Sequence, residues 1–255
     1  MDTIKKYANG KEYLIKVAKQ EERHLSGSRL GRHVEHDPRS RNYAIKTPAK
    51  LRLKTVIHNL VSPVLDQGSV GSCTGHAIIA CLSAKTYLDR IPTQNSFRPS
   101  TSPSKNQNLA LEFYKKATLI DEFYGAYPPD DTGSTGLAVA KIAKKLNLIS
   151  AYKHAFSFDA ALAALQAAPI IVGVNWYDGF DTPNSEGFVK VSGRPRGGHE
   201  FCIYGMDPNK GVVYARNSWG TSWGLKGNFN FSFRDLKRLL AEYGDATSFV
   251  ALPKK

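Results

Sequence analysis

The sequence predicts an α+β fold built as two lobes, and three observations support this. The chain has 255 residues, of which 42% are hydrophobic, so it is long enough to bury one sizeable core. Apolar residues recur at helical spacing between about residues 66 and 155. Between about residues 156 and 252, short apolar runs alternate with Gly, Pro, Asp and Asn, as strands and turns do. Helices followed by strands are typical of the α+β class, here with a helical N-terminal lobe and a β-rich C-terminal lobe.

The first 47 residues differ in character from the rest of the chain. They are polar and basic, and "LSGSRLGRHVEHDPRSRNY" contains Gly, Ser and Pro but little periodicity. We expect residues 1–47 to form a basic N-terminal extension or prosegment-like arm. Residues 48–255 are expected to form the folded domain.

Four segments of the domain show helical patterns. In the first, from Ser72 to about Leu88, small apolar residues recur three and four positions apart. This pattern places Cys73 at the N-terminus of a buried helix and Cys81 on its apolar face. The expected helices span 72–88, 108–123, 136–149 and 157–168.

Four later segments are rich in β-branched and aromatic residues and are bounded by turn-forming residues. "PIIVGVNWY" and "GNFNFSF" are the first and last of them. The expected strands span 169–177, 199–207, 211–219 and 227–233.

Composition argues against several classes of function. The chain carries 35 Lys and Arg against 22 Asp and Glu, a formal charge of +13, which favours anionic partners or acidic substrates. The basic residues are scattered and no aromatic-interleaved RNA-binding signature is present, so we predict no specific nucleic-acid partner. No run of about 18 apolar residues exists, so we predict no membrane span.

The cysteines indicate a reducing location. Cys73, Cys81 and Cys202 are too few and too widely spaced for a disulfide framework, and the N-terminus lacks the apolar stretch of a signal peptide. We therefore expect three free thiols and a location such as the cytoplasm. No C-x-x-C motif is present and no two of the seven histidines are four residues apart, so we predict no metal site and no cofactor.

Cys73 differs from the other two cysteines in its surroundings, "DQGSVGSCTGHA". A thiol needs help to ionise at neutral pH, and a helix N-terminus and an imidazolium both supply it. "GGHEFCIYG" offers His199 at the start of a strand, after two glycines that let a substrate backbone approach. "ARNSWGTSWGLKG" offers Asn217 to hold the imidazole tautomer and Trp219 to cover that hydrogen bond. We predict that Cys73 is a thiolate nucleophile and that Cys81 and Cys202 are inert core residues.

In this order, "DQGSVGSC", "GGHEF" and "NSWGTSWGLKG" resemble the papain-like (C1) cysteine peptidases. His199 and Asn217 lie 126 and 144 residues after Cys73, close to the roughly 130 to 150 typical of that family. The resemblance covers about residues 48–252. "HDPRSRNY", residues 36–43, is similar to a stretch of bacterial and phage-type members, which implies such a source.

The resemblance implies a papain-like two-lobe fold with an antiparallel β-rich lobe and an active-site cleft between the lobes. It implies that Cys73 is the nucleophile, His199 the general base and acid, and Asn217 the residue that orients His199. Gln67 would form an oxyanion hole with the backbone N–H of Cys73. Preorganised donors at that point stabilise the charge of a tetrahedral intermediate.

The resemblance also implies where substrate binds. Gly133 and Ser134, in the Gly-rich stretch "DDTGSTG", would pair with an extended substrate backbone. An apolar side chain two residues before the scissile bond would enter a pocket lined by the strand at 169–177. The remaining substrate-binding residues that we predict are Gly198, Trp219, Val172 and Val174.

The function predicted from these residues is cysteine-type endopeptidase activity on a polypeptide substrate. One alternative is an amidase, peptide ligase or acyl transferase, because the same fold and residues support those reactions. A second alternative is a non-catalytic papain-fold binding module. The motifs predict neither an oligomeric state nor the role of residues 1–47.

Overall fold

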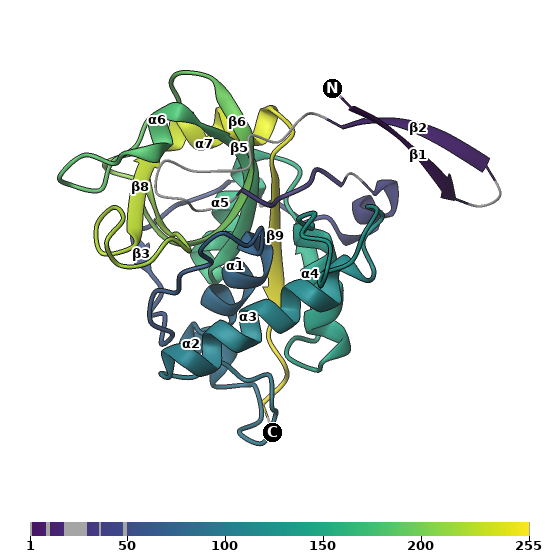
Figure 1. Ribbon diagram of the computed structural model, residues 1–255. Helices are drawn as coiled ribbons and strands as arrows, with labels where there is room; N and C mark the ends of the chain where they lie inside the picture. The colour runs from purple at the N-terminus through teal and green to yellow at the C-terminus, as the bar shows by residue number, and fades with distance from the viewer. Residues whose placement is uncertain (1, 9–10, 18–29, 36, 48–49, 255) are drawn as a thin grey trace.

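A computed structural model describes residues 2–8, 11–17, 30–35, 37–47 and 50–254 of the chain. Helices and strands follow one another in the order expected for an α+β protein (Figure 1). The helices are η1 (Pro38–Tyr43, a 3-10 helix), α1 (Cys73–Leu82), α2 (Lys85–Leu88), α3 (Pro103–Thr118), α4 (Gly136–Lys145), α5 (Phe158–Ala167), α6 (Asp178–Asp181) and α7 (Phe233–Ala241). The strands are β1 (Asp2–Ala8), β2 (Lys11–Val17), β3 (Val56–Ile57), β4 (Ala151–His154), β5 (Ile170–Tyr177), β6 (Pro195–Asp207), β7 (Val212–Arg216), β8 (Asn228–Ser232) and β9 (Asp245–Val250).

One antiparallel sheet organises the second half of the chain. Six of its strands follow the order β4-β9-β5-β6-β7-β8, and β3 pairs with β6 beside them. A separate hairpin pairs β1 with β2. The α+β fold class predicted from the sequence is confirmed.

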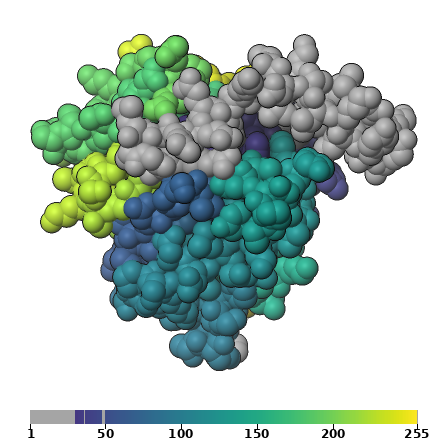
Figure 2. Space-filling model, viewed as in Figure 1, coloured from purple at the N-terminus to yellow at the C-terminus, as the bar shows by residue number. Residues whose placement is uncertain are grey.

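α1 lies between the two halves of the molecule (Figure 1). It packs against α3 on one side and β6 on the other, and every one of its residues is buried. Gly75 allows the close approach to α3, because a Cβ at this position would lie 2.1 Å from the carbonyl oxygen of Ala110. The blue-to-teal helical part and the green-to-yellow β-rich part form adjacent masses in the space-filling view (Figure 2).

All four predicted helices have different bounds in the structure, and the one expected at 136–149 ends at Lys145. The helix expected at 72–88 ends at Leu82, because Ala84 is extended and forms a β-bridge with Leu60. The helix expected at 108–123 begins at Pro103, where Ser102 accepts a hydrogen bond from the N–H of Lys105. Ser followed by Pro is a recognised start signal, and the sequence analysis missed it.

Within the described ranges, no helix is long and apolar enough to cross a membrane. All three cysteines are free and buried, as predicted. Cys81 donates to the carbonyl of Pro169, 3.3 Å away, inside the hydrophobic core. The division into an arm at 1–47 and a domain at 48–255 stays a prediction.

Candidate active site

Cys73 is the first residue of α1, and its side chain has no solvent exposure. Burial raises the pKa of its thiol to about 12, and backbone hydrogen bonds from Glu200, Gly31 and Thr74 partly oppose that rise. The contact with Glu200 places the thiol against β6 at the residue that follows His199. The thiolate that the sequence analysis predicts for Cys73 stays a prediction.

His199 on β6 and Asn217 just after β7 are joined by a hydrogen bond. His199 Nε2 lies 2.8 Å from Asn217 Oδ1. The backbone N–H of Ser218 donates to the same oxygen at 2.8 Å, which identifies that atom as the amide oxygen. Nε2 must therefore carry the hydrogen, and Nδ1 is the basic nitrogen of the neutral imidazole.

Two tryptophans surround the imidazole of His199. The ring of Trp219 lies 4.9 Å from it at 34°, and the ring of Trp176 packs edge-on at 4.8 Å. Both indoles are buried, so water is kept from the hydrogen bond between His199 and Asn217. Trp219 thus lies where the sequence analysis expected it.

Gln67 is held in one orientation by hydrogen bonds at both ends of its amide. Its Nε2 donates to the carbonyl of Val70 at 2.9 Å, and its Oε1 accepts from the hydroxyl of Ser218 at 2.6 Å. Its backbone N–H also donates to the carbonyl of Ser218 at 2.8 Å. Ser218 therefore connects Gln67 to Asn217, a role that the sequence analysis did not assign.

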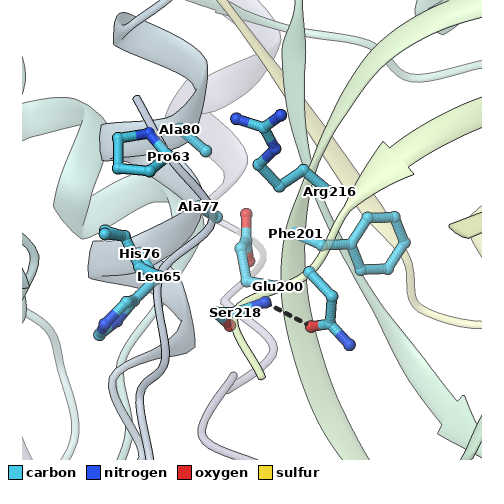
Figure 3. A pocket seen from close by; sticks show the side chains of 10 residues that line it. Pro63, Leu65, His76, Ala77, Ala80, Glu200, Phe201, Arg216 and Ser218 are labelled. Atoms are coloured by element: carbon cyan, nitrogen blue, oxygen red, sulfur yellow. Dashed lines mark hydrogen bonds between the residues drawn. The ribbon is translucent and has the colours of Figure 1, made fainter. Parts of the chain in front are cut away.

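The contact between α1 and the strands beside this network is closely packed. His76, Ala77 and Ala80 of α1 face Glu200 and Asn217 across a cavity of about 10 Å³ (Figure 3). That volume is about enough for one water molecule. The positions of Glu200 and Asn217 relative to α1 are therefore fixed by close packing.

Residues 30–35 of the arm, here called the arm segment, run in an extended form past Cys73. The N–H of Arg32 donates to the carbonyl of Gly198 at 3.0 Å. Ser134 donates its N–H to Gly31 at 2.8 Å and accepts from the N–H of His33 at 2.8 Å. Ser134 and Gly198 thus bind an extended backbone, which is the role predicted for them towards substrate.

The arm segment lies in a narrow groove lined by glycines. A Cβ on Gly31 would lie 1.9 Å from the carbonyl oxygen of Gly71, two residues before Cys73. A Cβ on Gly133, whose φ is +85°, would lie 2.4 Å from the carbonyl oxygen of Gly31. Only residues without a side chain fit at Gly31 and Gly133.

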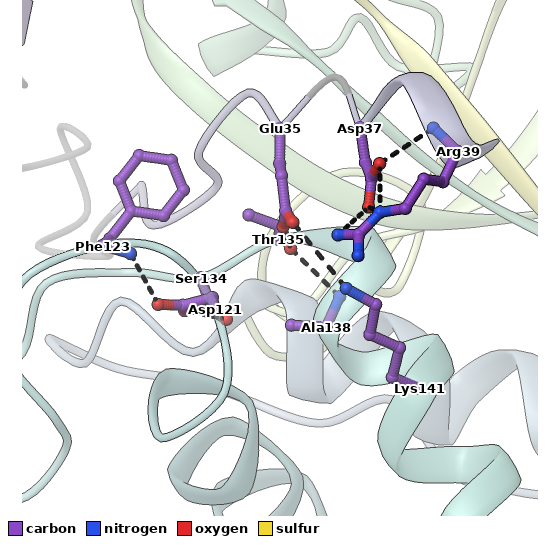
Figure 4. A network of polar contacts seen from close by, with 9 residues as sticks. All are labelled: Glu35, Asp37, Arg39, Asp121, Phe123, Ser134, Thr135, Ala138 and Lys141. Atoms are coloured by element: carbon purple, nitrogen blue, oxygen red, sulfur yellow. Dashed lines mark hydrogen bonds and ion pairs between the residues drawn. The ribbon is translucent and has the colours of Figure 1, made fainter. Parts of the chain in front are cut away.

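Side chains also fasten the arm segment to the start of α4 (Figure 4). Glu35 accepts a 2.6 Å hydrogen bond from the hydroxyl of Thr135, the N-cap residue of α4, and pairs with Lys141 at 3.9 Å. The hydroxyl of Ser134 donates to Asp121 at 2.6 Å, which stiffens the loop that the arm segment contacts. Negative charge at a helix N-terminus is favourable, so Glu35 is well placed to hold the arm.

The prediction that Val172 or Val174 lines a substrate pocket is wrong. Both valines have no solvent exposure and belong to the core cluster that includes Trp176. Gly173, between the two valines in β5, faces the opposite side of the sheet. It lies beside the arm segment, because a Cβ on Gly173 would be 2.5 Å from Arg32 Nε. The pairing of Gly173 with Glu200 places both residues on that face.

Charged groups, and not apolar ones, surround this face of Gly173. The guanidinium of Arg32 is buried and pairs with Asp245 on β9. Burial raises the pKa of the Glu200 carboxyl well above its usual range, Asp245 raises it further, and Arg32 opposes the rise. Across the portion of the chain that the structure describes, no group of three His, Cys, Asp or Glu side chains is arranged to hold a metal ion.

Comparisons with known proteins agree with this arrangement. A peptidase C1-like protein of Acanthamoeba polyphaga mimivirus is 24% identical over 204 residues, covering 67% of this chain and 64% of the relative. A cathepsin B-like protein of Giardia intestinalis is 26% identical over 216 residues, covering 75% of this chain and 71% of the relative. The chain is related to the papain-like C1 peptidases.

Solved structures show the same papain-like fold. Xylellain, a cysteine protease from Xylella fastidiosa, superposes with a TM-score of 0.68 at 18% identity, covering 93% of this chain and all of that one. A recombinant stem bromelain precursor matches with a TM-score of 0.50 at 14% identity, covering 91% of this chain and 78% of that one. No family model matches the sequence.

Proposed function

We propose that this papain-like chain is a cysteine-type endopeptidase that hydrolyses polypeptides with Cys73 as nucleophile. The observation that carries the proposal is the hydrogen bond from His199 Nε2 to Asn217, which leaves Nδ1 as the basic nitrogen of the imidazole. His199 directly precedes Glu200, whose backbone contacts the thiol of Cys73. A thiol at a helix start with a base of fixed tautomer is the arrangement that nucleophilic catalysis requires.

In the proposed reaction His199 Nδ1 takes the thiol proton and Cys73 attacks the carbonyl carbon of the scissile bond. The oxygen of the tetrahedral intermediate receives hydrogen bonds from the backbone N–H of Cys73 and the side-chain amide of Gln67. His199 then protonates the leaving amine, which leaves a thioester on Cys73. A water molecule, deprotonated by His199, hydrolyses the thioester and restores the thiol.

Each element of this scheme has a structural support. The backbone N–H of Cys73 belongs to the first turn of α1, where N–H groups have no partner within the helix. Ser218 holds the amide of Gln67, so the donor is oriented before substrate arrives. Gly133, Ser134 and Gly198 contact an extended backbone in the arm segment, and we propose that they contact substrate in the same way.

Mass spectrometry of a diverse peptide mixture tests the proposal. The full-length protein is incubated with the mixture under reducing conditions, beside Cys73→Ala and the matched control Cys202→Ala. We expect cuts with the wild type and with Cys202→Ala, and none with Cys73→Ala, because Cys202 is a core thiol on β6. Cuts that persist in Cys73→Ala would refute the proposal, and products joined to an added amine would identify an acyl transferase instead.

A further inference from the structure

The side chain of Arg32 fills a pocket whose other walls are acidic. The pocket lies between the N-terminus of α4, β5, β6 and β9, and the Arg32 side chain has no solvent exposure within it. One nitrogen, Nη2, contacts Asp245 and also donates to the carbonyl of Tyr243 at 2.8 Å. Asp245 keeps 23% of its side chain exposed, on the side that faces a larger cavity of about 610 Å³.

Glu200 supplies the second carboxyl group of the pocket. Its side chain is fully buried, and neither carboxyl oxygen has a hydrogen-bond partner among the residues that the structure describes. Three polar atoms surround the point that a Cβ on Gly173 would occupy. Arg32 Nε lies 2.5 Å from that point, one of the Glu200 oxygens 2.6 Å and an oxygen of Asp245 2.9 Å. Buried carboxyl groups normally have donors, so Glu200 indicates a site that a donor-rich group can complete.

The two glycines of the pocket make the space for a long side chain. A Cβ on Gly136 would lie 2.6 Å from Glu200 and 3.2 Å from Asp245, and a Cβ on Gly173 would overlap the Arg32 guanidinium. Replacing either glycine by a larger residue would therefore close the pocket. A guanidinium or ammonium group on a flexible stem fits both the length and the charge of this space.

Arg32 itself uses this pocket incompletely. Its Nε and Nη1 are buried without a hydrogen-bond partner although two carboxyl groups lie beside them. The backbone of the arm segment, fixed by Gly198 and Ser134, sets how far the guanidinium reaches. An arginine or lysine side chain of a substrate, whose backbone lies elsewhere, can reach further into the pocket.

We propose that this acidic pocket is a specificity subsite that selects arginine or lysine in a polypeptide substrate, at the position two residues before the scissile bond. The inference rests on the proposed endopeptidase function. It reverses two expectations from the sequence, because a pocket lined by Glu200 and Asp245 favours neither an apolar side chain nor an acidic substrate. Arg32 occupies the subsite in the full-length chain and must leave before substrate enters.

The test compares two fluorogenic peptides that differ only at that position, one with arginine and one with citrulline, its uncharged isostere. The enzyme is the full-length Arg32→Ala variant, in which the pocket is unoccupied by the arm's own guanidinium. We expect kcat/KM to be roughly 10- to 100-fold higher for the arginine peptide, because hydrogen bonds to a charged group are the stronger ones. Equal values for the two peptides would overturn the proposal.

Second substitutions in the Arg32→Ala background assign the preference to the pocket. Asp245→Asn should lower kcat/KM for the arginine peptide by about tenfold or more while the citrulline value changes little. Glu200→Gln should lower the ratio of the arginine value to the citrulline value by a similar factor. Asp159→Asn and Glu186→Gln are the matched controls, since both residues are exposed and outside the pocket. An arginine preference that survives both pocket substitutions would also overturn the proposal.

A binding measurement separates failure of the subsite from failure of the peptidase function. Isothermal titration of the Cys73→Ala/Arg32→Ala double variant with the same two peptides requires no catalysis. Tighter binding of the arginine peptide, lost in Asp245→Asn, would support the subsite even if no peptide is cleaved. Equal binding of the two peptides would overturn it, whatever the activity of the enzyme.

Discussion

Substituting Arg32 by alanine should expose the Cys73 thiol to chemical labelling. In the full-length chain the arm segment contacts the thiol through the backbone of Gly31 and is anchored next to that contact by the Arg32 side chain. Alkylation of Cys73 therefore requires the arm segment to leave its groove. The labelling rate then reports the fraction of molecules in which the arm is undocked.

The expected size of the effect follows from the contacts of Arg32. The variant loses a hydrogen bond to the carbonyl of Tyr243 and a buried ion pair with Asp245. Hydrogen bonds to charged groups contribute about 1.5 to 3 kcal/mol each, so docking should weaken by about 3 kcal/mol. Since 1.4 kcal/mol is a factor of ten, labelling should become roughly 100-fold faster.

The assay is intact-protein mass spectrometry during reaction with iodoacetamide, followed by peptide mapping. Gly31→Ala should give a similar acceleration by steric means, because the added methyl group would lie 1.9 Å from the carbonyl oxygen of Gly71. Arg39→Ala is the matched control, since that arginine is in the same arm and its partner among the described residues is nearby Asp37. Labelling at the wild-type rate in both arm variants would refute the reasoning, and equal labelling of the other two cysteines would reveal general unfolding instead.

Three further predictions concern the network around His199 and the neighbouring His76 on α1. Asn217→Ala should lower kcat by roughly 30-fold, about 2 kcal/mol for the lost hydrogen bond that fixes the tautomer, and should shift the pH profile of kcat because the imidazole is no longer held. Ser218→Ala should lower kcat by about tenfold with little change in KM, because only the orientation of Gln67 is lost. Burial lowers the pKa of His76. Below about pH 6.5 the unfolded chain therefore binds a proton that the folded chain does not. As a result, the free energy of unfolding should fall by up to about 1.4 kcal/mol for each unit by which the pH decreases. Urea titrations between pH 7 and pH 5 should show a shallower fall for His76→Gln, and an identical slope would contradict this assignment.

Sequence patterns located the residues of the candidate site well because they depend on local signals. Turn-forming residues before Cys73 and apolar spacing after it predict a helix start, and α1 does begin there. Asn217 lies directly after β7, at a strand end that Asn marks in the sequence. His199, expected at the start of a strand, lies within β6, which begins at Pro195. Ser218 was missed because its hydroxyl reaches Gln67 from a residue 151 positions away, a contact that only the folded chain creates.

The acidic pocket was unpredictable for a related reason. β5 is buried on both faces, so its sequence "IIVGVNWY" is a continuous apolar run without the alternation that would show which residues face the cleft. The pairing of β5 with β6 determines which residues of β5 face the cleft. In that pairing Val174 lies opposite His199, and Gly173 lies opposite Glu200. A one-residue shift of that register would have presented the valines instead.

The burial of Cys73 and the occupation of the acidic pocket are consequences of one docked segment. The backbone of Gly31 forms a hydrogen bond with the buried thiol, and the next residue, Arg32, places its guanidinium in the pocket. A substrate that displaces Arg32 from Asp245 must lift Gly31 off the thiol, because consecutive residues cannot separate. Undocking then removes the backbone that covers the thiol and leaves space for a substrate carbonyl beside Cys73. A basic substrate residue would thus compete with the arm segment at the pocket and, by the same displacement, uncover the nucleophile.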